Sequence, residues 1–335
     1  MSRTLHLIAR AAAILTIVAV AGAGALWWWI VQPLPLPVSP FAFDVKSGAS
    51  LKSVARELAG AGAVPAEFAL VALARLEGVD RAIKAGNYEI AAGITLPQLL
   101  DKLTQGDVTQ SAFTVVEGAT FAEFAGALAA NPAIVKTVLD LPAAELARRV
   151  GVPGPNLEGW FFPDTYFFAA GSPDLALLVR AHRLMRSRLD AAWANRASDL
   201  PLKEPYEMLI LASMVEKETG RAADRPRIAS VFVNRLRLGM RLQSDPTVIY
   251  GLGARFDGNL RKRDLEADTP YNSYTRGGLP PTPIALPGQA SLDAVANPPQ
   301  TAYLYFVARG DGASEFSANL ADHNRAVAKF QLGQR

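Results

Sequence analysis

The sequence predicts an α+β protein in three parts: an N-terminal transmembrane helix, a small module of helices and strands, and a larger mixed α+β domain. Three observations predict this class. An uncharged apolar run near the N-terminus is long enough to cross a membrane. Segments with helical spacing of apolar residues alternate with short strand-like segments. Half of the 335 residues are hydrophobic and 19% are charged, which is enough for a substantial core.

Charge and cysteine content exclude several classes of function. The net charge of +3 does not indicate a nucleic-acid surface, so we expect no nucleic-acid partner. The absence of cysteine excludes disulfides, a cysteine nucleophile and thiolate metal sites.

The N-terminus predicts a membrane anchor. Residues 1–10 carry Arg3 and Arg10 and are predicted to be a cytoplasmic tail, and residues 11–32 to be the transmembrane anchor. The run ends in three tryptophans, which favour the membrane interface. The alternative is a cleavable signal peptide, because Ala21 to Ala25 are small residues. The run is longer than a usual signal core, so an uncleaved anchor is favoured, with the remaining chain outside the cytoplasm.

A linker and a small module follow the anchor. Residues 33–40 are proline-rich and predict a stiff spacer. Residues 41–110 predict a strand, two helices and a strand, followed by a further helix at 95–103. This βααβ order resembles a LysM-type carbohydrate-binding fold, although many small α+β modules share it.

Residues 111–335 predict the larger domain. Helices are expected near 121–129, 144–150, 173–193, 205–219, 224–238, 292–296 and 318–330, with strands at 113–117 and 303–307. Residues 241–299 predict long ordered loops. The aromatic cluster at 157–166 has two interpretations, a surface that stacks on sugars and a plug in the core.

Acid-base chemistry is left to carboxylates. The histidines are His6, His182 and His323, and neither of the last two has metal-ligand spacing to another histidine. We therefore interpret both as ordinary surface or capping residues, and expect no metal and no cofactor. No nucleophile elbow for Ser-His-Asp hydrolysis is present either.

Two carboxylates end the apolar helix that runs from Leu209 toward Gly220. Glu216 and Glu218 are about 200° apart around a helix, so they face different surroundings. Glu218 follows an apolar stripe, and desolvation there would raise its pKa, as a general acid requires. Glu216 follows a smaller, more polar face and is expected to meet a basic or amide partner as a supporting residue. The alternative is that both are solvated at a frayed helix end.

Several long motifs resemble the YceG-like (MltG) endolytic murein transglycosylases. They are E-G-W-F-F-P-D-T at 158–165, A-S-M-V-E-K-E-T at 212–219, V-F-V-N-R-L at 231–236, M-R-L-Q-S-D-P-T-V-I-Y-G at 240–251, Y-N-S-Y at 271–274, G-L-P-P at 278–281, Y-L-Y-F-V at 303–307 and H-N at 323–324. The resemblance covers nearly the whole chain. It departs at Ser314, where many relatives have histidine, and at Thr282, where many have glycine.

The resemblance implies a single-pass protein of the bacterial inner membrane with a periplasmic catalytic domain. It implies cleavage of the MurNAc–GlcNAc bond inside nascent peptidoglycan strands, leaving 1,6-anhydro-MurNAc ends, and penicillin-binding synthases as possible partners. The catalytic acid is then Glu218, the second glutamate of E-K-E-T. Substrate-binding residues are expected in the loops: Gln243, Ser244, Asp245, Thr247, Tyr271, Asn272 and Tyr274.

Two alternatives stay open. The first is a hydrolytic muramidase that pairs Glu218 with a second carboxylate such as Asp245, although Asp245 precedes a proline and could simply start a turn. The second is a non-catalytic scaffold that binds peptidoglycan.

Overall fold

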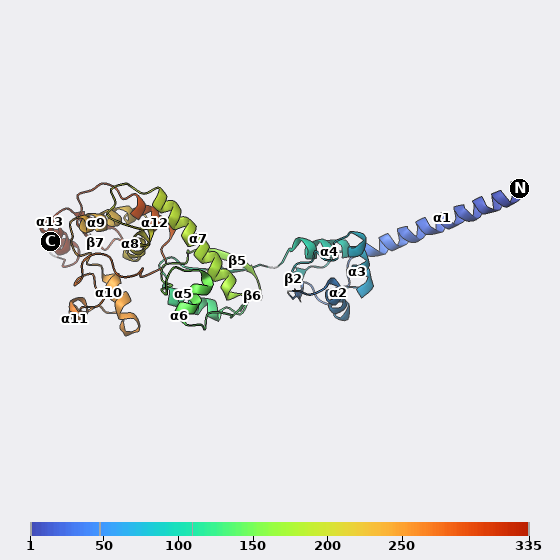
Figure 1. Ribbon diagram of the computed structural model, residues 1–335, viewed down its shortest axis with the longest axis horizontal. Helices are drawn as coiled ribbons and strands as arrows, with labels where there is room; N and C mark the ends of the chain where they lie inside the picture. Colours follow the sequence, from blue (N-terminus) through green and yellow to red (C-terminus); the bar gives the residue numbers. More distant parts are fainter. Residues whose placement is uncertain (1, 47, 109, 334–335) are drawn as a thin grey trace. The chain divides into compact units, whose positions relative to one another are not determined.

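The computed structural model describes residues 2–46, 48–108 and 110–333. The chain divides into two compact units. The N-terminal unit comprises Met1–Ser111 with Phe168–Gly171, and the C-terminal unit comprises Ala112–Phe167 and Ser172–Arg335. The predicted α+β class is confirmed, with helices and two-stranded sheets in the same chain (Figure 1).

The N-terminal unit begins with one long helix, α1 (Ser2–Ile30). Within the described residues, α1 alone is long and apolar enough to cross a membrane, over Ala13–Ile30. No residue of this window is buried, and only its end, at Ile30, packs against the rest of the unit. Length and composition therefore suit a single-pass anchor.

The module of this unit has the predicted βααβ order. Strand β1 (Phe41–Val45) is followed by helices α2 (Leu51–Gly60) and α3 (Glu67–Leu76), strand β2 (Gly86–Ile90) and helix α4 (Leu96–Gln105). The strands pair antiparallel, with Phe41 opposite Ile90. Helices α2 and α4 begin at hydroxyl residues that cap them: Ser50 accepts from the backbone of Ser53, and Thr95 forms a capping box.

The proline-rich stretch is not a free spacer along its whole length. Leu34 is buried in the module core, and its backbone N–H donates to the carbonyl of Ile94 at 2.8 Å. Pro33 forms an isolated bridge with Thr95. The reason is hydrophobic: Leu34 and Leu36 alternate with the prolines, and Leu36 also packs on the core.

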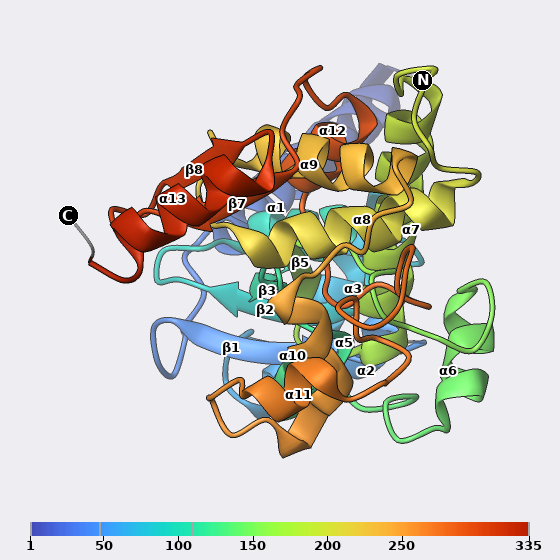
Figure 2. The same ribbon diagram turned by 90° about the vertical axis from the view of Figure 1, so that its left-hand side faces the viewer.

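The C-terminal unit is built around helix α8 (Pro205–Glu218), in which Met208 to Val215 are all buried. Helices α7 (Asp174–Ala194), α9 (Arg225–Arg237) and α12 (Gln289–Ala296) pack against it. Figure 2 shows α8 and α9 side by side. Because α8 is apolar on every side, neighbours must cover it all round.

The remaining elements are shorter, and all lie in this unit except the first two residues of β3 and the last two of β5. They are β3 (Gln110–Thr114), α5 (Phe121–Ala130), β4 (Ile134–Val135), α6 (Ala143–Val150), β5 (Thr165–Ala169), β6 (Ser172–Pro173), α10 (Asp245–Leu252), a 3₁₀ turn (Gly253–Arg255), α11 (Lys262–Glu266), β7 (Tyr305–Ala308), β8 (Ser314–Ser317) and α13 (Leu320–Phe330). Strands β3 and β5 pair, β4 and β6 pair parallel, and β7 and β8 pair antiparallel.

Two expectations are resolved here. The aromatic cluster is a core plug: Trp160, Phe161, Phe162 and Tyr166 are all buried, so they offer no face to a sugar. The long loop region contains α10 and α11, which the sequence did not predict. Pro246 lies in the first turn of α10, where its fixed φ and missing N–H suit a helix start.

Candidate active site

The two carboxylates at the end of α8 diverge. Glu216 turns toward α9 and α12, and its side chain is only 5% exposed. It forms an ion pair with Arg225 at 3.1 Å, and it accepts hydrogen bonds from Ser291 Oγ at 2.7 Å and the Gly288 N–H at 2.9 Å. A Cβ at position 288 would lie against the Glu117 side chain, which would have to move aside. Every contact of Glu216 is thus with the protein's own framework.

Glu218 turns to the other side and is half-buried. It accepts a hydrogen bond from Ser244 Oγ. Burial raises the pKa of Glu218 to about 7, and the negative charge of Asp245 adds to the rise, while the Ser244 hydrogen bond and the Arg235 charge oppose it. A carboxyl group with such a pKa is a substantial fraction protonated near neutral pH, which a general acid requires.

Arg235 of α9 holds the loop that carries Ser244. The guanidinium is buried and donates to the backbone carbonyls of Leu304, Arg241 and Leu242, at 2.7, 3.2 and 2.9 Å. It also donates to Gln243 Oε1 at 3.3 Å. Gln243 has a φ of +51°, which is unfavourable for a residue with a side chain. Backbone held in this region often marks a functional site.

The loop that carries Ser273 fixes the position of Ser244 through hydrogen bonds. Ser273 Oγ accepts from the Ser244 N–H at 2.9 Å and lies 2.8 Å from Thr247 Oγ1. Thr247 also donates to the Ser244 carbonyl at 2.7 Å. Asn272 donates to the carbonyls of 264, 265 and 267. Thr247 and Asn272 are fully buried, so both hold loops and neither faces the cavity as a substrate-binding residue would.

A cavity of about 620 Å³ opens beside Glu218. Three of the predicted substrate-binding residues line it: Gln243, Asp245 and Tyr274. Tyr274 OH donates to Asp245 Oδ1 at 2.5 Å, which fixes both side chains. Tyr271 lies apart, with its hydroxyl 2.9 Å from Thr282 and its ring against Tyr250. The departure at Ser314 falls in the cavity wall.

The other side of the cavity comes from the C-terminal elements, which the sequence reasoning did not assign to the site. Tyr305 of β7 and His323 of α13 stack with ring centroids 5.1 Å apart, and both line the cavity. Burial, together with the Arg235 charge, lowers the pKa of His323 below its usual value. Its Nδ1 is buried and has no hydrogen-bond partner among the described residues.

One sequence signal could have found Arg235. It continues the apolar spacing of Ile228, Val231 and Phe232 along α9, so its charge had to be buried. The interpretation of His323 as an ordinary surface or capping residue does not fit its place in the cavity wall. His182 is also not a surface residue: it is buried, with its ring nitrogens 3.1 Å from the carbonyls of Trp160 and Gly151.

A second carboxyl group with a raised pKa lies elsewhere in this unit. Glu158 is buried, and burial raises its pKa to about 7. It accepts from the Phe121 N–H at 2.8 Å and from Tyr250 OH at 3.1 Å, so it ties the start of α5 to α10. Glu158 is not among the residues that line the Glu218 cavity. Within the described part of the chain, no group of three or more metal-ligating side chains is placed to hold a metal ion.

Comparison with known proteins places this geometry in a family. The YceG-like family matches residues 43–329. The endolytic murein transglycosylase of Bacillus subtilis (strain 168) is 33% identical over 307 residues, which cover 86% of this chain and 84% of that protein. The endolytic murein transglycosylase of Streptococcus pneumoniae (strain D39) is 31% identical over 253 residues, 72% of this chain and 44% of that protein.

A solved structure of a YceG-like protein supports the same family. The 2.6 Å crystal structure of a YceG-like protein from Listeria monocytogenes is 28% identical and aligns with a TM-score of 0.52, covering 85% of this chain and 98% of that one. The family match includes both glutamates of α8, the loops around Ser244 and the C-terminal wall of the cavity. The chain belongs to the YceG-like family.

Proposed function

We propose that this protein is a membrane-anchored lytic transglycosylase that cuts peptidoglycan glycan strands internally. The bond is the MurNAc–GlcNAc β-1,4 linkage, and the product carries a 1,6-anhydro-MurNAc end. The observation that carries this proposal is Glu218, a carboxyl group with a pKa of about 7 at the wall of a cavity large enough for sugar units. The relatives named as endolytic murein transglycosylases support the choice of substrate.

One carboxyl group performs both steps of the reaction. Protonated Glu218 donates its proton to the glycosidic oxygen as the bond to the anomeric carbon breaks, through an oxocarbenium-like state. The resulting carboxylate then takes the proton of the muramyl 6-hydroxyl as that oxygen bonds to the anomeric carbon. Glu218 ends protonated, no water is consumed, and no second carboxylate is required.

The surrounding residues tune and place the acid. Ser244 holds the carboxyl of Glu218 by its hydrogen bond, and Asp245 raises the pKa of Glu218 by its charge. Gln243, Tyr274 and the neutral imidazole of His323 line the cavity and offer hydrogen bonds to sugar hydroxyls. Glu216 is a supporting residue that fixes the last turn of α8 through Arg225.

A hydrolytic muramidase is the second candidate, because Asp245 lies in the same cavity as Glu218. Hydrolysis with inversion would use such a carboxylate to activate water. In this structure Asp245 accepts from Tyr274 OH, so its role in our proposal is electrostatic.

The N-terminal unit anchors the enzyme and contacts its substrate. In this proposal α1 spans the inner membrane once, with the module and the C-terminal unit in the periplasm. The βααβ module is LysM-like and binds glycan strands. Cutting nascent strands at the membrane would end their elongation, and penicillin-binding synthases are the expected partners.

Mass spectrometry of digested glycan tests the reaction. Purified strands with blocked reducing ends are incubated with the full chain and with Glu218→Gln. Internal cuts with anhydro ends from the wild type alone support the proposal. Reducing ends without the anhydro mass indicate the muramidase. No cleavage by the folded wild-type protein, with retained glycan binding, indicates a non-catalytic scaffold.

A further inference from the structure

Helix α3 of the N-terminal module exposes large apolar side chains. Phe68 is 68% exposed and Leu76 is 83% exposed, and the exposed Ala72 lies between them on the same side of the helix. Elsewhere in the described part of this unit, the large exposed apolar side chains belong to α1, apart from Val38. Apolar residues gathered on one helix face indicate a surface that is covered in the working protein.

The position of α3 indicates what covers it. Ile30, the last residue of α1, packs against the module core, and only Val31, Gln32 and Pro33 separate it from buried Leu34. Pro65, just before α3, lines one cavity together with Trp28 and Trp29 of α1. Figure 1 shows α3 at the edge of the module from which α1 leaves. No flexible linker therefore separates the module from α1. Helix α3 starts beside the tryptophans that mark the membrane interface.

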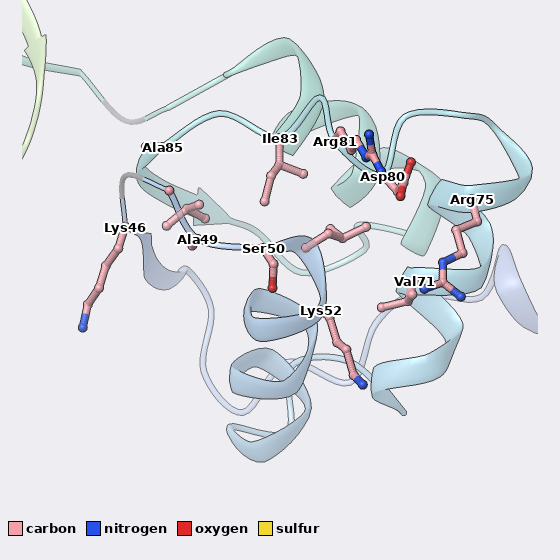
Figure 3. Close-up of a pocket in the computed structure, with 13 residues that line it drawn as sticks. Lys46, Ala49, Ser50, Lys52, Val71, Arg75, Asp80, Arg81, Ile83 and Ala85 are labelled. Carbon is pink, nitrogen blue, oxygen red and sulfur yellow. The ribbon is translucent and has the colours of Figure 1, made fainter.

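The charges around α3 favour an anionic surface. Glu67 is the acidic residue within α3 and pairs with Arg56 at 3.3 Å, and Glu77, which is exposed, caps the C-terminal end of the helix. Arg75 lies on the exposed face of α3 and shares a cavity of about 490 Å³ with Lys46, Lys52 and Arg81, with the single carboxylate Asp80 among them (Figure 3). The carboxylates of Glu89, Asp101 and Asp107 line a different cavity, together with Lys102, which pairs with Asp107 at 2.6 Å. The cations are thus gathered on the side of the module that includes α3.

We propose that the exposed face of α3 lies in the headgroup layer of the bilayer that α1 enters, with Phe68 and Leu76 inserted and Arg75 facing anionic lipid. Amphipathic helices with cations beside an apolar face bind membrane interfaces in this way. The inference rests on the proposed membrane anchoring by α1. It adds that the module has one fixed orientation on the membrane and does not turn freely about the end of α1.

Site-directed fluorescence in nanodiscs tests this orientation. The chain has no cysteine, so single labels are simple to place. Full-length Phe68→Cys, Leu76→Cys, Val18→Cys and Asp44→Cys carry an environment-sensitive fluorophore in phosphatidylglycerol-containing discs with nitroxide-labelled lipid. Val18 lies in α1, and Asp44 is exposed on β1, whose partner strand β2 lies at the opposite edge of the module in Figure 1.

We expect blue-shifted emission at 68 and 76 and loss of roughly half of it or more to shallow nitroxides, since interfacial helices insert about 5–10 Å. Label 18 should be quenched by deep nitroxides and label 44 by neither. In phosphatidylcholine discs, or with Arg75→Glu, quenching at 68 and 76 should fall while that at 18 is unchanged.

Three outcomes overturn the inference. If 68 and 76 behave like 44 while 18 is quenched, the anchor stands and the docking of α3 fails. A blue shift at 68 and 76 without lipid quenching means that a protein surface, such as a second copy, covers α3. If 18 is not quenched, the proposed anchoring fails and the docking fails with it.

Discussion

The last turn of α8 carries two glutamates, Glu216 and Glu218, that have opposite roles on its two sides. On one side, Glu216 has an arginine, a serine hydroxyl and a backbone N–H around its carboxylate. On the other side, Glu218 meets Ser244, a nearby carboxylate and an open cavity. A buried carboxylate with a full set of charged and hydrogen-bonding partners is fixed in position by them, which suits a structural role. A carboxyl group with fewer partners keeps its proton, which suits catalysis.

The comparison teaches that position along the helix does not decide the role. Both glutamates lie in the last turn, where the helix dipole disfavours negative charge. What differs is the neighbouring chain, with α9 and α12 around Glu216 and the 241–245 loop around Glu218. Both neighbours come from distant segments, so the difference is tertiary.

The largest expected effect comes from Glu218→Gln. Loss of the only acid-base group in the proposed mechanism should lower the rate of anhydro-end formation by roughly 10²–10⁴-fold or more. The isosteric amide should leave the thermal unfolding temperature at or above that of wild type at neutral pH. Product formation at the wild-type rate would contradict the role of Glu218.

Glu216→Ala should affect stability first. It leaves Arg225 buried without its partner, and such a change costs about 3 kcal/mol. Denaturant unfolding of the purified full-length protein, followed by fluorescence, measures the cost. The matched Glu218→Gln protein should show no such loss. If both variants lose equal stability, the two sides of the turn do not differ as described.

The stability of Glu218→Gln relative to wild type should depend on pH. The pKa of Glu218 is raised in the folded state to about 7, so the folded protein binds the proton more tightly than the unfolded chain does. That contribution is present at low pH and is lost as the pH rises from about 4.5 through about 7. At pH 8, Glu218→Gln should therefore be more stable than wild type by roughly 3 kcal/mol. At pH 4, calorimetry should find the two proteins alike.

Ser244→Ala should produce the smallest and most specific change. Its hydrogen bond lowers the pKa of Glu218, so its removal should raise that pKa. The rate of cleavage is expected to fall on the alkaline side as Glu218 loses its proton, and this limb should move to higher pH in the variant. Thr247→Val serves as the control, because it removes a hydrogen bond to the Ser244 carbonyl and leaves the Ser244 hydroxyl in place. A limb that stays in place would show that Ser244 does not act on Glu218.

The sequence predicted the parts of the fold that depend on local pattern. The βααβ order of the module, the long apolar α8 and the helix after Asp224 follow from spacing and caps. Helix α10 was missed because its single buried pair, Thr247 and Val248, gives no helical periodicity. The aromatic cluster could not be assigned, because Trp160 and Phe161 are equally suited to a core and to a sugar surface, and only tertiary packing decides.

In the candidate site, too, some residues were predictable from local pattern and others depend on tertiary contacts. Helix geometry separated Glu216 from Glu218, because angular position is a local property. The burial of Asn272 and Thr247 and the approach of His323 to the cavity were not predictable, since each depends on contacts between segments far apart in sequence. The burial of Arg235 could have been predicted, because this charged residue continues the helical spacing of the apolar residues of α9.

A direct titration of Glu218 tests the central claim that burial keeps this carboxyl protonated near neutral pH. Side-chain carboxyl ¹³C resonances of glutamate-labelled protein are followed from pH 4 to 9 in the wild type, Glu218→Gln and Glu158→Gln. We expect a resonance that titrates near pH 7 in the wild type, disappears in Glu218→Gln and remains in Glu158→Gln. If the resonance lost in Glu218→Gln titrates instead near pH 4.5, the ordinary value for glutamate, Glu218 is not the acid described here.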